Sequence, residues 1–171
     1  MNIKNIIGDY ETFIGDLISQ LDRLSIHIND MSISHINYRV ETDSQYENMR
    51  DLLKTFCKEF VETQFNGRAV SILQLKNPLH VSKSHSIPII ELPAPRSVHT
   101  YLRGLEHLGL VVGKDLPEFK LKYQNILTGE KDRRPYCFPA FITFSDGKTA
   151  KFYDRSLKDV VLMQGWAFEK L

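Results

Sequence analysis

Two strand-like stretches of the same design, each led by a histidine, limit most strongly what this chain can fold into. Apolar residues occupy every second position of residues 34–40, and the same alternation continues in residues 105–112. This pattern is typical of a β-strand with one face in a core. His35 and His107 lie on the other face of their strands. Because the stretches stand about half a chain apart, they indicate an internal repeat.

The two strands open the same series of elements. The first is followed by a helical pattern and by strands near residues 61–65, 69–75 and 87–92. The second is followed by a helical pattern, a long loop with one short strand, and strands near residues 140–144 and 149–153. We therefore expect an α+β fold with two βαβββ modules, residues 32–95 and 96–171, in one structural domain.

Residues 1–31 precede the modules as an amphipathic helix. Apolar residues recur at three- and four-residue steps from Ile3 to Leu24, which predicts one helix of about six turns. Its apolar face must be covered by the domain or by a second subunit, so a monomer and a homodimer both remain open. A last helix is expected from Leu157 to about Trp166.

Local signals place three further boundaries. Ser44 and Glu47 have the spacing of a capping box at the start of the first module's helix. Asn66-Gly67 predicts a two-residue hairpin turn, because both residues tolerate positive φ. Residues 77–86 read as a polar loop that begins at Asn77-Pro78.

Charge and composition exclude several classes of protein. The 22 basic and 21 acidic residues leave a net charge of +1, which does not favour a nucleic acid or a membrane surface as partner. No apolar run reaches the roughly 18 residues of a membrane span, and no signal-peptide core is visible, so we expect a cytoplasmic protein. Cys57 and Cys137 match no metal or redox spacing and are expected to be free thiols.

Several short motifs follow one another in an order that resembles a known family. They are His35-Ile36 with Arg39, Asn66-Gly67-Arg68, Ile90-Glu91-Leu92-Pro93, Glu106-His107, and Asp146-Gly147-Lys148-Thr149 with Lys151-Phe152. Over residues 32–161 the chain resembles YecM-like proteins of the vicinal-oxygen-chelate superfamily, the group of glyoxalases, bleomycin-resistance proteins and extradiol dioxygenases. The resemblance implies two βαβββ modules that form a cupped mixed sheet around a metal site, with the helices outside.

The resemblance also implies a set of metal ligands. Superfamily ligands come from the first and last strands of each module, which correspond here to His35, Glu91, His107 and, in the fourth place, Lys151. That place normally holds a carboxylate, and a protonated lysine has no lone pair for a metal. Two histidines and one carboxylate leave coordination positions open and suit a divalent iron, manganese, zinc or nickel ion.

The residues themselves leave a second interpretation open. Glu91 stands between Ile90 and Leu92, where an unpaired carboxylate would be costly to bury. A metal would compensate it. An ion pair with Arg39 or Lys151 would do so too, with both histidines hydrogen-bonded in a closed core.

Other polar residues are candidates for contact with a substrate. Lys151 can hold an anionic oxygen when it is protonated or act as a general base when its pKa is lowered, unless it only pairs with Glu91. Arg39 can grip an anionic group with two hydrogen bonds, so Lys151 and Arg39 are the catalytic candidates. Asn37 and Arg68 are the substrate-binding candidates, although Arg68 can equally be a solvated hairpin charge.

Three features near these strands have secondary expectations. Glu106 adjoins His107 with the opposite parity, so it is expected to be a structural or supporting group. His99 is placed at the mouth of the cup, and residues 131–134 form a charged loop that can attract anions or simply be solvated.

The leading hypothesis is a cytoplasmic metal-dependent enzyme, a lyase, isomerase or oxygenase, that acts on a small oxygenated anionic metabolite. The resemblance implies that vicinal oxygens of the substrate chelate the ion, which acts as a Lewis acid on an enolate-like intermediate or in a ring-cleaving oxygenation. The alternative is a small-ligand-binding protein without enzymatic activity, whose cup holds no metal. Neither hypothesis names the substrate.

Overall fold

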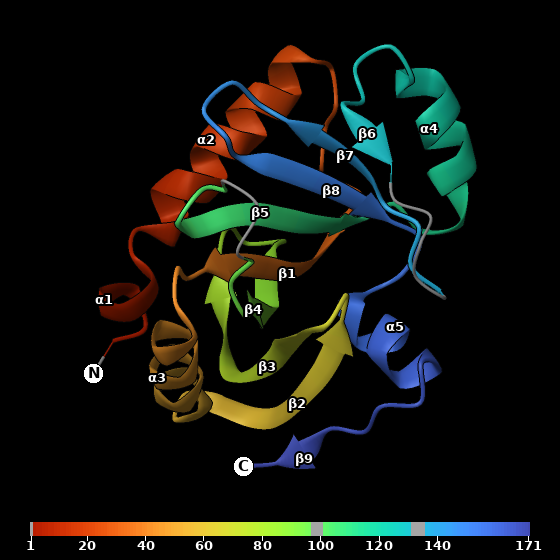
Figure 1. Ribbon diagram of the computed structural model, residues 1–171. Coiled ribbons are helices and arrows are strands. Elements are labelled where there is room, and N and C mark those ends of the chain that lie inside the picture. Colours follow the sequence, from red (N-terminus) through yellow and green to blue (C-terminus); the bar gives the residue numbers. More distant parts are fainter. Residues whose placement is uncertain (1, 97–100, 131–135) are drawn as a thin grey trace.

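The computed structural model describes residues 2–96, 101–130 and 136–171. Within these ranges the chain is an α+β protein in which nine strands form one mixed sheet and five α-helices pack around it (Figure 1), as the sequence predicts. The strands are β1 (Ser32–Arg39), β2 (Cys57–Phe65), β3 (Arg68–His80), β4 (Ser86–Pro93), β5 (Gly104–Val111), β6 (Gly129–Glu130), β7 (Ala140–Thr143), β8 (Thr149–Tyr153) and β9 (Glu169–Lys170). The α-helices are α1 (Lys4–Ile7), α2 (Tyr10–Arg23), α3 (Asp43–Lys54), α4 (Leu116–Tyr123) and α5 (Leu157–Met163), and a 3-10 turn, Gly113–Asp115, precedes α4.

The strand order brings the ends of both modules to the centre of the sheet. That order is β6-β7-β8-β5-β1-β4-β3-β2-β9. In each module the first strand pairs in parallel with the last, β1 with β4 and β5 with β8, and the modules join where β1 pairs antiparallel with β5. The four adjacent strands β8, β5, β1 and β4 are therefore the first and last strands of the two modules.

The two faces of the sheet bury different residues because side chains alternate along each strand. Outward-facing residues such as Leu108 and Ile36 join the main core with α2, α3 and α4. On the inner face, Ile72 and Ile89 pack against Leu157 of α5. The inner side chains of the four central strands include the candidate ligand positions His35, Glu91, His107 and Lys151.

The N-terminal segment is two helices and not the single helix predicted from Ile3 to Leu24. Gly8 has a positive φ of 86°, which ends α1, and the Asp9 carboxylate then caps α2 by accepting a hydrogen bond from the Thr12 amide at 3.3 Å. The apolar periodicity continues through this break, so the sequence pattern did not reveal where α1 ends. The predicted apolar face of α2 is buried in the chain's own core through Phe13, Ile14, Leu17 and Leu21.

The N-cap of helix α3 lies two residues before the predicted one. Thr42 is the N-cap, and its side chain accepts a hydrogen bond from the Gln45 amide at 3.1 Å. The Gln45 side chain in turn accepts one from the Glu41 amide at 2.9 Å. The prediction from Ser44 and Glu47 was wrong because Thr42 and Gln45 have the same spacing and chemistry.

The prediction of the hairpin turn is confirmed, whereas the prediction of the loop after it is wrong. Asn66 and Gly67, with φ values of 51° and 74°, join β2 to β3 as predicted. The loop predicted over residues 77–86 was wrong, because β3 continues through its first positions. An irregularity after Gln74 lets the pairing with β4 resume at Leu79, which is buried.

Two further observations concern the cysteines and the helices. Both cysteines are buried thiols, as expected. No helix in the described part of the chain has the length and apolar character that a membrane span requires.

Substitution of Thr42 tests the position of the α3 cap. Thr42→Ala is expected to lower the free energy of unfolding by about 1 kcal/mol, because it leaves a helix amide without its acceptor. Ser44→Ala, at an exposed position in the same turn, is the matched control and is expected to change it by less than about 0.5 kcal/mol. Urea denaturation measures both values, and equal losses in the two variants would contradict this cap.

Candidate metal centre

The four central strands bring the predicted ligand positions together on the inner face of the sheet. His35 lies on β1, Glu91 on β4, His107 on β5 and Lys151 on β8. In the register of the sheet, His35 pairs with Gly109, and Gly109 pairs in turn with Lys151 across β5 and β8. His35 and Lys151 are therefore at one level of the sheet, whereas Glu91 pairs with Asn37, two positions further along β1.

His35, Glu91 and His107 form a compact group of possible metal ligands. The Nε2 atom of His107 lies 3.2 Å from Oε2 of Glu91, and Nε2 of His35 lies 4.0 Å from the same oxygen. One ligand atom from each residue lies within 4.8 Å of the other two. Ligands at about 2.0 to 2.2 Å from one ion are themselves about 3 to 3.5 Å apart, so small movements would bring all three into coordination.

A β-bulge in each histidine strand brings the preceding residue beside the imidazole. Ser34 is an extra residue in β1, and β5 places both Glu106 and His107 opposite a single residue of β1. The Ser34 Oγ lies 3.0 Å from Nδ1 of His35, and Oε2 of Glu106 lies 2.8 Å from Nδ1 of His107. Because of this bulge, the side chains of Glu106 and His107 do not alternate strictly between the two faces of the sheet. The contact between them agrees with the supporting position expected for Glu106.

The contact with Glu106 orients the ring of His107. An ionised carboxylate can only accept hydrogen bonds, so Nδ1 of His107 donates to Glu106, and Nε2, which lies beside Glu91 and Lys151, is the nitrogen that a metal would use. Burial would raise the pKa of Glu106, but His107, Lys151 and Arg39 outweigh it and hold that pKa well below its usual range. A carboxylate that orients an imidazole in this way makes it a more basic metal ligand.

His35 is held from the first turn of α5 and by a close approach to β5. The Ser34 Oγ beside its Nδ1 also accepts the backbone N–H of Leu157 at 2.7 Å. A Cβ atom on Gly109 would lie 2.2 Å from Cε1 of His35. The imidazole therefore occupies the space that a side chain at Gly109 would need.

Glu91 remains ionised although it is buried. Burial would raise its pKa, but the hydrogen bond with His107 and the positive charges of His35 and Lys151 hold that pKa well below its usual range. Asn37 also donates a hydrogen bond from Nδ2 to Oε2 of Glu91 at 2.8 Å. The Oδ1 atom of Asn37 is buried and has no hydrogen-bond partner among the described residues, so a bound donor such as water is expected there.

Lys151 and Arg39 approach His107 from different sides. The Lys151 Nζ lies 3.2 Å from Nε2 of His107, the lone pair that a metal would use, so an ion there requires the ammonium group to move aside. Arg39 donates from Nε to Oε2 of Glu106 at 2.9 Å. The carboxylate that Arg39 holds is thus Glu106, whereas the ion-pair interpretation of the sequence expected Glu91.

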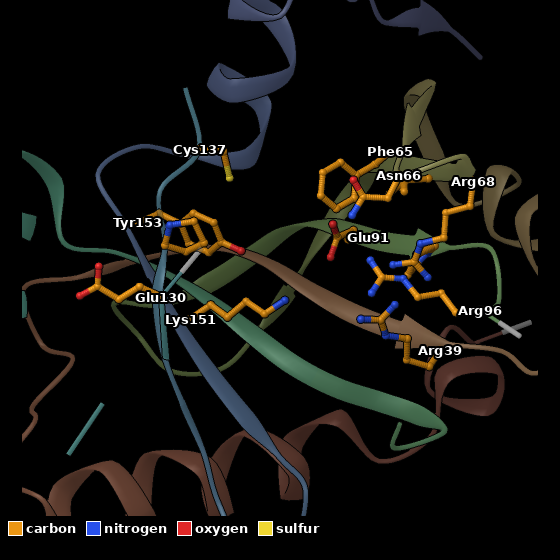
Figure 2. Close-up of a pocket in the computed structure, with 13 residues that line it drawn as sticks. Arg39, Phe65, Asn66, Arg68, Glu91, Arg96, Glu130, Cys137, Lys151 and Tyr153 are labelled. Atoms are coloured by element: carbon orange, nitrogen blue, oxygen red, sulfur yellow. The ribbon is translucent and has the colours of Figure 1, made fainter. Parts of the chain in front are cut away.

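A cavity of about 380 Å³ opens in front of this group and is lined by Glu91 and Lys151. Figure 2 shows Arg39, Arg68 and Arg96 together on one side of Glu91, with Tyr153 and Glu130 on the other. Arg68 is half-buried and donates from a guanidinium nitrogen to the Ala94 carbonyl at 2.7 Å, so it is not the solvated hairpin charge of the alternative interpretation.

Sequence reasoning missed part of this cavity lining. Tyr153 was within reach of the parity argument, because it follows Lys151 by two positions in one strand and its ring meets His35 edge-on, with the ring centroids 5.4 Å apart. Arg96 follows a proline in a connector and has no periodic pattern to mark it. The expectations for His99 and for residues 131–134 lie outside the described residues.

Comparisons with known proteins agree with the predicted resemblance. The family model described as YecM protein matches residues 2–136. An uncharacterised protein of Haemophilus influenzae is 23% identical over 111 residues, which are 65% of this chain and 58% of that relative's length.

One solved structure shows the same fold over most of the chain. The structure described as Structural Genomics, Protein EC4020 superimposes with a TM-score of 0.77 at 23% identity and covers 94% of this chain and 92% of its own. The 2,2',3-trihydroxybiphenyl 1,2-dioxygenase from Sphingomonas wittichii matches with a TM-score of 0.41 and 13% identity, over 81% of this chain and 50% of its own. The family model covers well over half of the sequence, and the chain therefore belongs to the YecM family.

Proposed function

We propose that this protein is a metal-dependent enzyme of the vicinal-oxygen-chelate type that acts on a small oxygenated anionic metabolite. The observation that carries the proposal is the convergence of His35, Glu91 and His107, whose ligand atoms lie within 4.8 Å of one another beside a cavity of about 380 Å³. A cavity of this volume suits a small molecule.

The donor set fits a divalent ion of iron, manganese, zinc or nickel. Two imidazole nitrogens and one carboxylate oxygen are ligands that these ions share, and three protein ligands leave room for substrate oxygens. The contacts behind them, from Ser34 to His35 and from Glu106 to His107, orient both rings as ligands require. A bound ion would supply Lewis-acid polarisation of the substrate oxygens.

The chain's own cations supply the other part of the proposed chemistry. Lys151 Nζ, once displaced from Nε2 of His107, would face the cavity and hold an anionic oxygen or exchange a proton with it. Arg39 keeps Glu106 ionised and in place, and its other nitrogens remain available to a substrate anion. Asn37 can accept a hydrogen bond from a substrate hydroxyl through Oδ1.

The alternative is a small-ligand-binding protein with a metal-free cup. It is favoured by one observation, the 3.2 Å contact of Lys151 with the ligand nitrogen of His107, which keeps the group closed. This alternative differs from the enzyme in two respects, since it takes up no stoichiometric metal and releases a bound organic acid unchanged.

Metal content separates the two functions. Protein purified without an affinity tag and reconstituted with divalent ions is expected to hold stoichiometric metal, because three ligands are already close together. His35→Ala and His107→Ala are expected to lose it, whereas His27→Ala, at an exposed histidine, is the matched control and keeps it. Elemental analysis gives the metal content. Wild-type protein without stoichiometric metal would refute the proposal, and with metal present the products formed from keto, hydroxy and catecholic acids identify the reaction.

Gly109 tests the position of His35 without removing a ligand. Gly109→Ala places a Cβ within 2.2 Å of the imidazole, so it is expected to displace His35, to weaken metal binding and to cost about 1 to 3 kcal/mol of stability. Gly15→Ala, in α2 with nothing within 4 Å of the added Cβ, is the control and is expected to be neutral or stabilising. Metal titration and thermal denaturation measure these effects. Unchanged metal affinity in Gly109→Ala would contradict the assigned position of His35.

Glu106 tests the support of His107. Glu106→Gln keeps the shape of the side chain but removes the acceptor charge at Nδ1, so metal affinity is expected to fall about 10- to 100-fold. Glu62→Gln, a carboxylate that binds Tyr46 away from the site, serves as the control. Competition with a chelator measures both affinities, and an equal effect of the two substitutions would show that Glu106 has no special role.

A further inference from the structure

Three arginines on one side of the cavity form a group with too few counter-ions. Arg39, Arg68 and Arg96 line the cavity and point toward the same region (Figure 2). Arg39 has the Glu106 carboxylate as partner at 2.9 Å. In the described ranges, neither Arg68 nor Arg96 has a carboxylate within 4.0 Å. We call these three residues the arginine cluster.

Arg68 shows the strain of this arrangement. Its Nε atom is buried and lacks a hydrogen-bond partner among the described residues. Burial, together with the positive charges of Arg39 and Arg96, lowers its pKa to about 10. A buried guanidinium donor without an acceptor is costly, and so is the repulsion between like charges, which Glu91 offsets only in part. An anion bound at the arginine cluster would relieve both costs.

The charge and shape of the arginine cluster indicate which class of anion it binds. Arg39 pairs with Glu106, and Glu91, the carboxylate that lines the same cavity, bonds to His107 and Asn37. The charges of Arg68 and Arg96 remain, which match a dianion. A phosphoryl group offers two charges and three acceptor oxygens that can meet several guanidinium groups at once. A single carboxylate has one charge and two oxygens in one plane. Because the cavity measures only about 380 Å³, a small molecule carries this group and a nucleic acid does not.

We propose that the arginine cluster is a subsite for the phosphoryl or phosphonyl group of the substrate. It lies beside the metal centre, because Arg39 binds Glu106 and Glu106 binds His107. The substrate class is then a small phosphorylated or phosphonate compound whose other oxygens reach His35, Glu91 and His107. This inference rests on the proposed function for the second end of the substrate but not for the subsite itself.

Calorimetric titration of metal-free protein with inorganic phosphate tests the subsite. Chelator-treated protein at low, constant ionic strength is expected to bind phosphate and to bind acetate at least about tenfold more weakly. Arg68→Gln and Arg96→Gln are each expected to weaken phosphate binding at least about tenfold, since each removes a charged donor.

Arg96 makes no hydrogen bond in the described part of the chain, so its variant avoids the risk that Arg68→Gln fails to fold. Arg103→Gln, at an exposed arginine that pairs with Glu41, is the matched control and is expected to change affinity by less than about twofold.

The outcomes separate this inference from the proposed function. The subsite would be overturned, and the metal centre left untouched, by any of three results: no phosphate binding by wild-type protein, phosphate binding by both cluster variants as tight as by wild type, or equal affinity of the wild-type protein for phosphate and acetate. His35→Ala is expected to keep phosphate binding while it loses metal. Phosphate binding by a protein that takes up no metal would support the subsite and refute the metal-dependent function alone.

Discussion

Glu91 places an ionised carboxylate on a buried sheet face, and its burial must be compensated from neighbouring strands. Asn37 donates to it from β1, and the imidazoles of His35 and His107 approach it from β1 and β5. Without such partners, a buried carboxylate would be costly. Since Glu91 and His107 belong to different modules, the group forms only when the modules pair along β1 and β5. Assembly of the sheet and assembly of the site are therefore one event.

The two modules orient their histidines in the same way but with different side chains. Each inserts a bulge beside its histidine, so that the preceding side chain reaches Nδ1. In the first module that side chain is the Ser34 hydroxyl, and the empty space above Gly109 holds the ring of His35. In the second module, the side chain that reaches Nδ1 is the Glu106 carboxylate, which Arg39 holds in place. His35 is thus positioned mainly by packing, whereas His107 is positioned mainly by charge.

Strand parity explains how much of the site the sequence could predict. Alternation placed His35 and His107 on the non-core face, the order of elements gave the two modules, and the family resemblance implied that both strands line one site. Parity fails where the backbone leaves the regular pleat, as at Glu106, and periodicity did not detect the break at Gly8. The arginine cluster was beyond reach for another reason. Arg96 enters it from an irregular connector, so its place depends on tertiary packing that no local pattern records.

Lys151 changes the electrostatics of the position at which the superfamily resemblance expects a fourth, carboxylate ligand. An ammonium group in place of a carboxylate raises the local charge by two units, beside a group that already contains two imidazoles and one carboxylate. With a divalent ion bound, the centre would then be strongly positive. A neutral substrate would gain little from this field, whereas an anionic one would be attracted and would help to draw the ammonium group away from Nε2 of His107. Substrate and metal would then favour each other's binding, because both require Lys151 to leave the same lone pair.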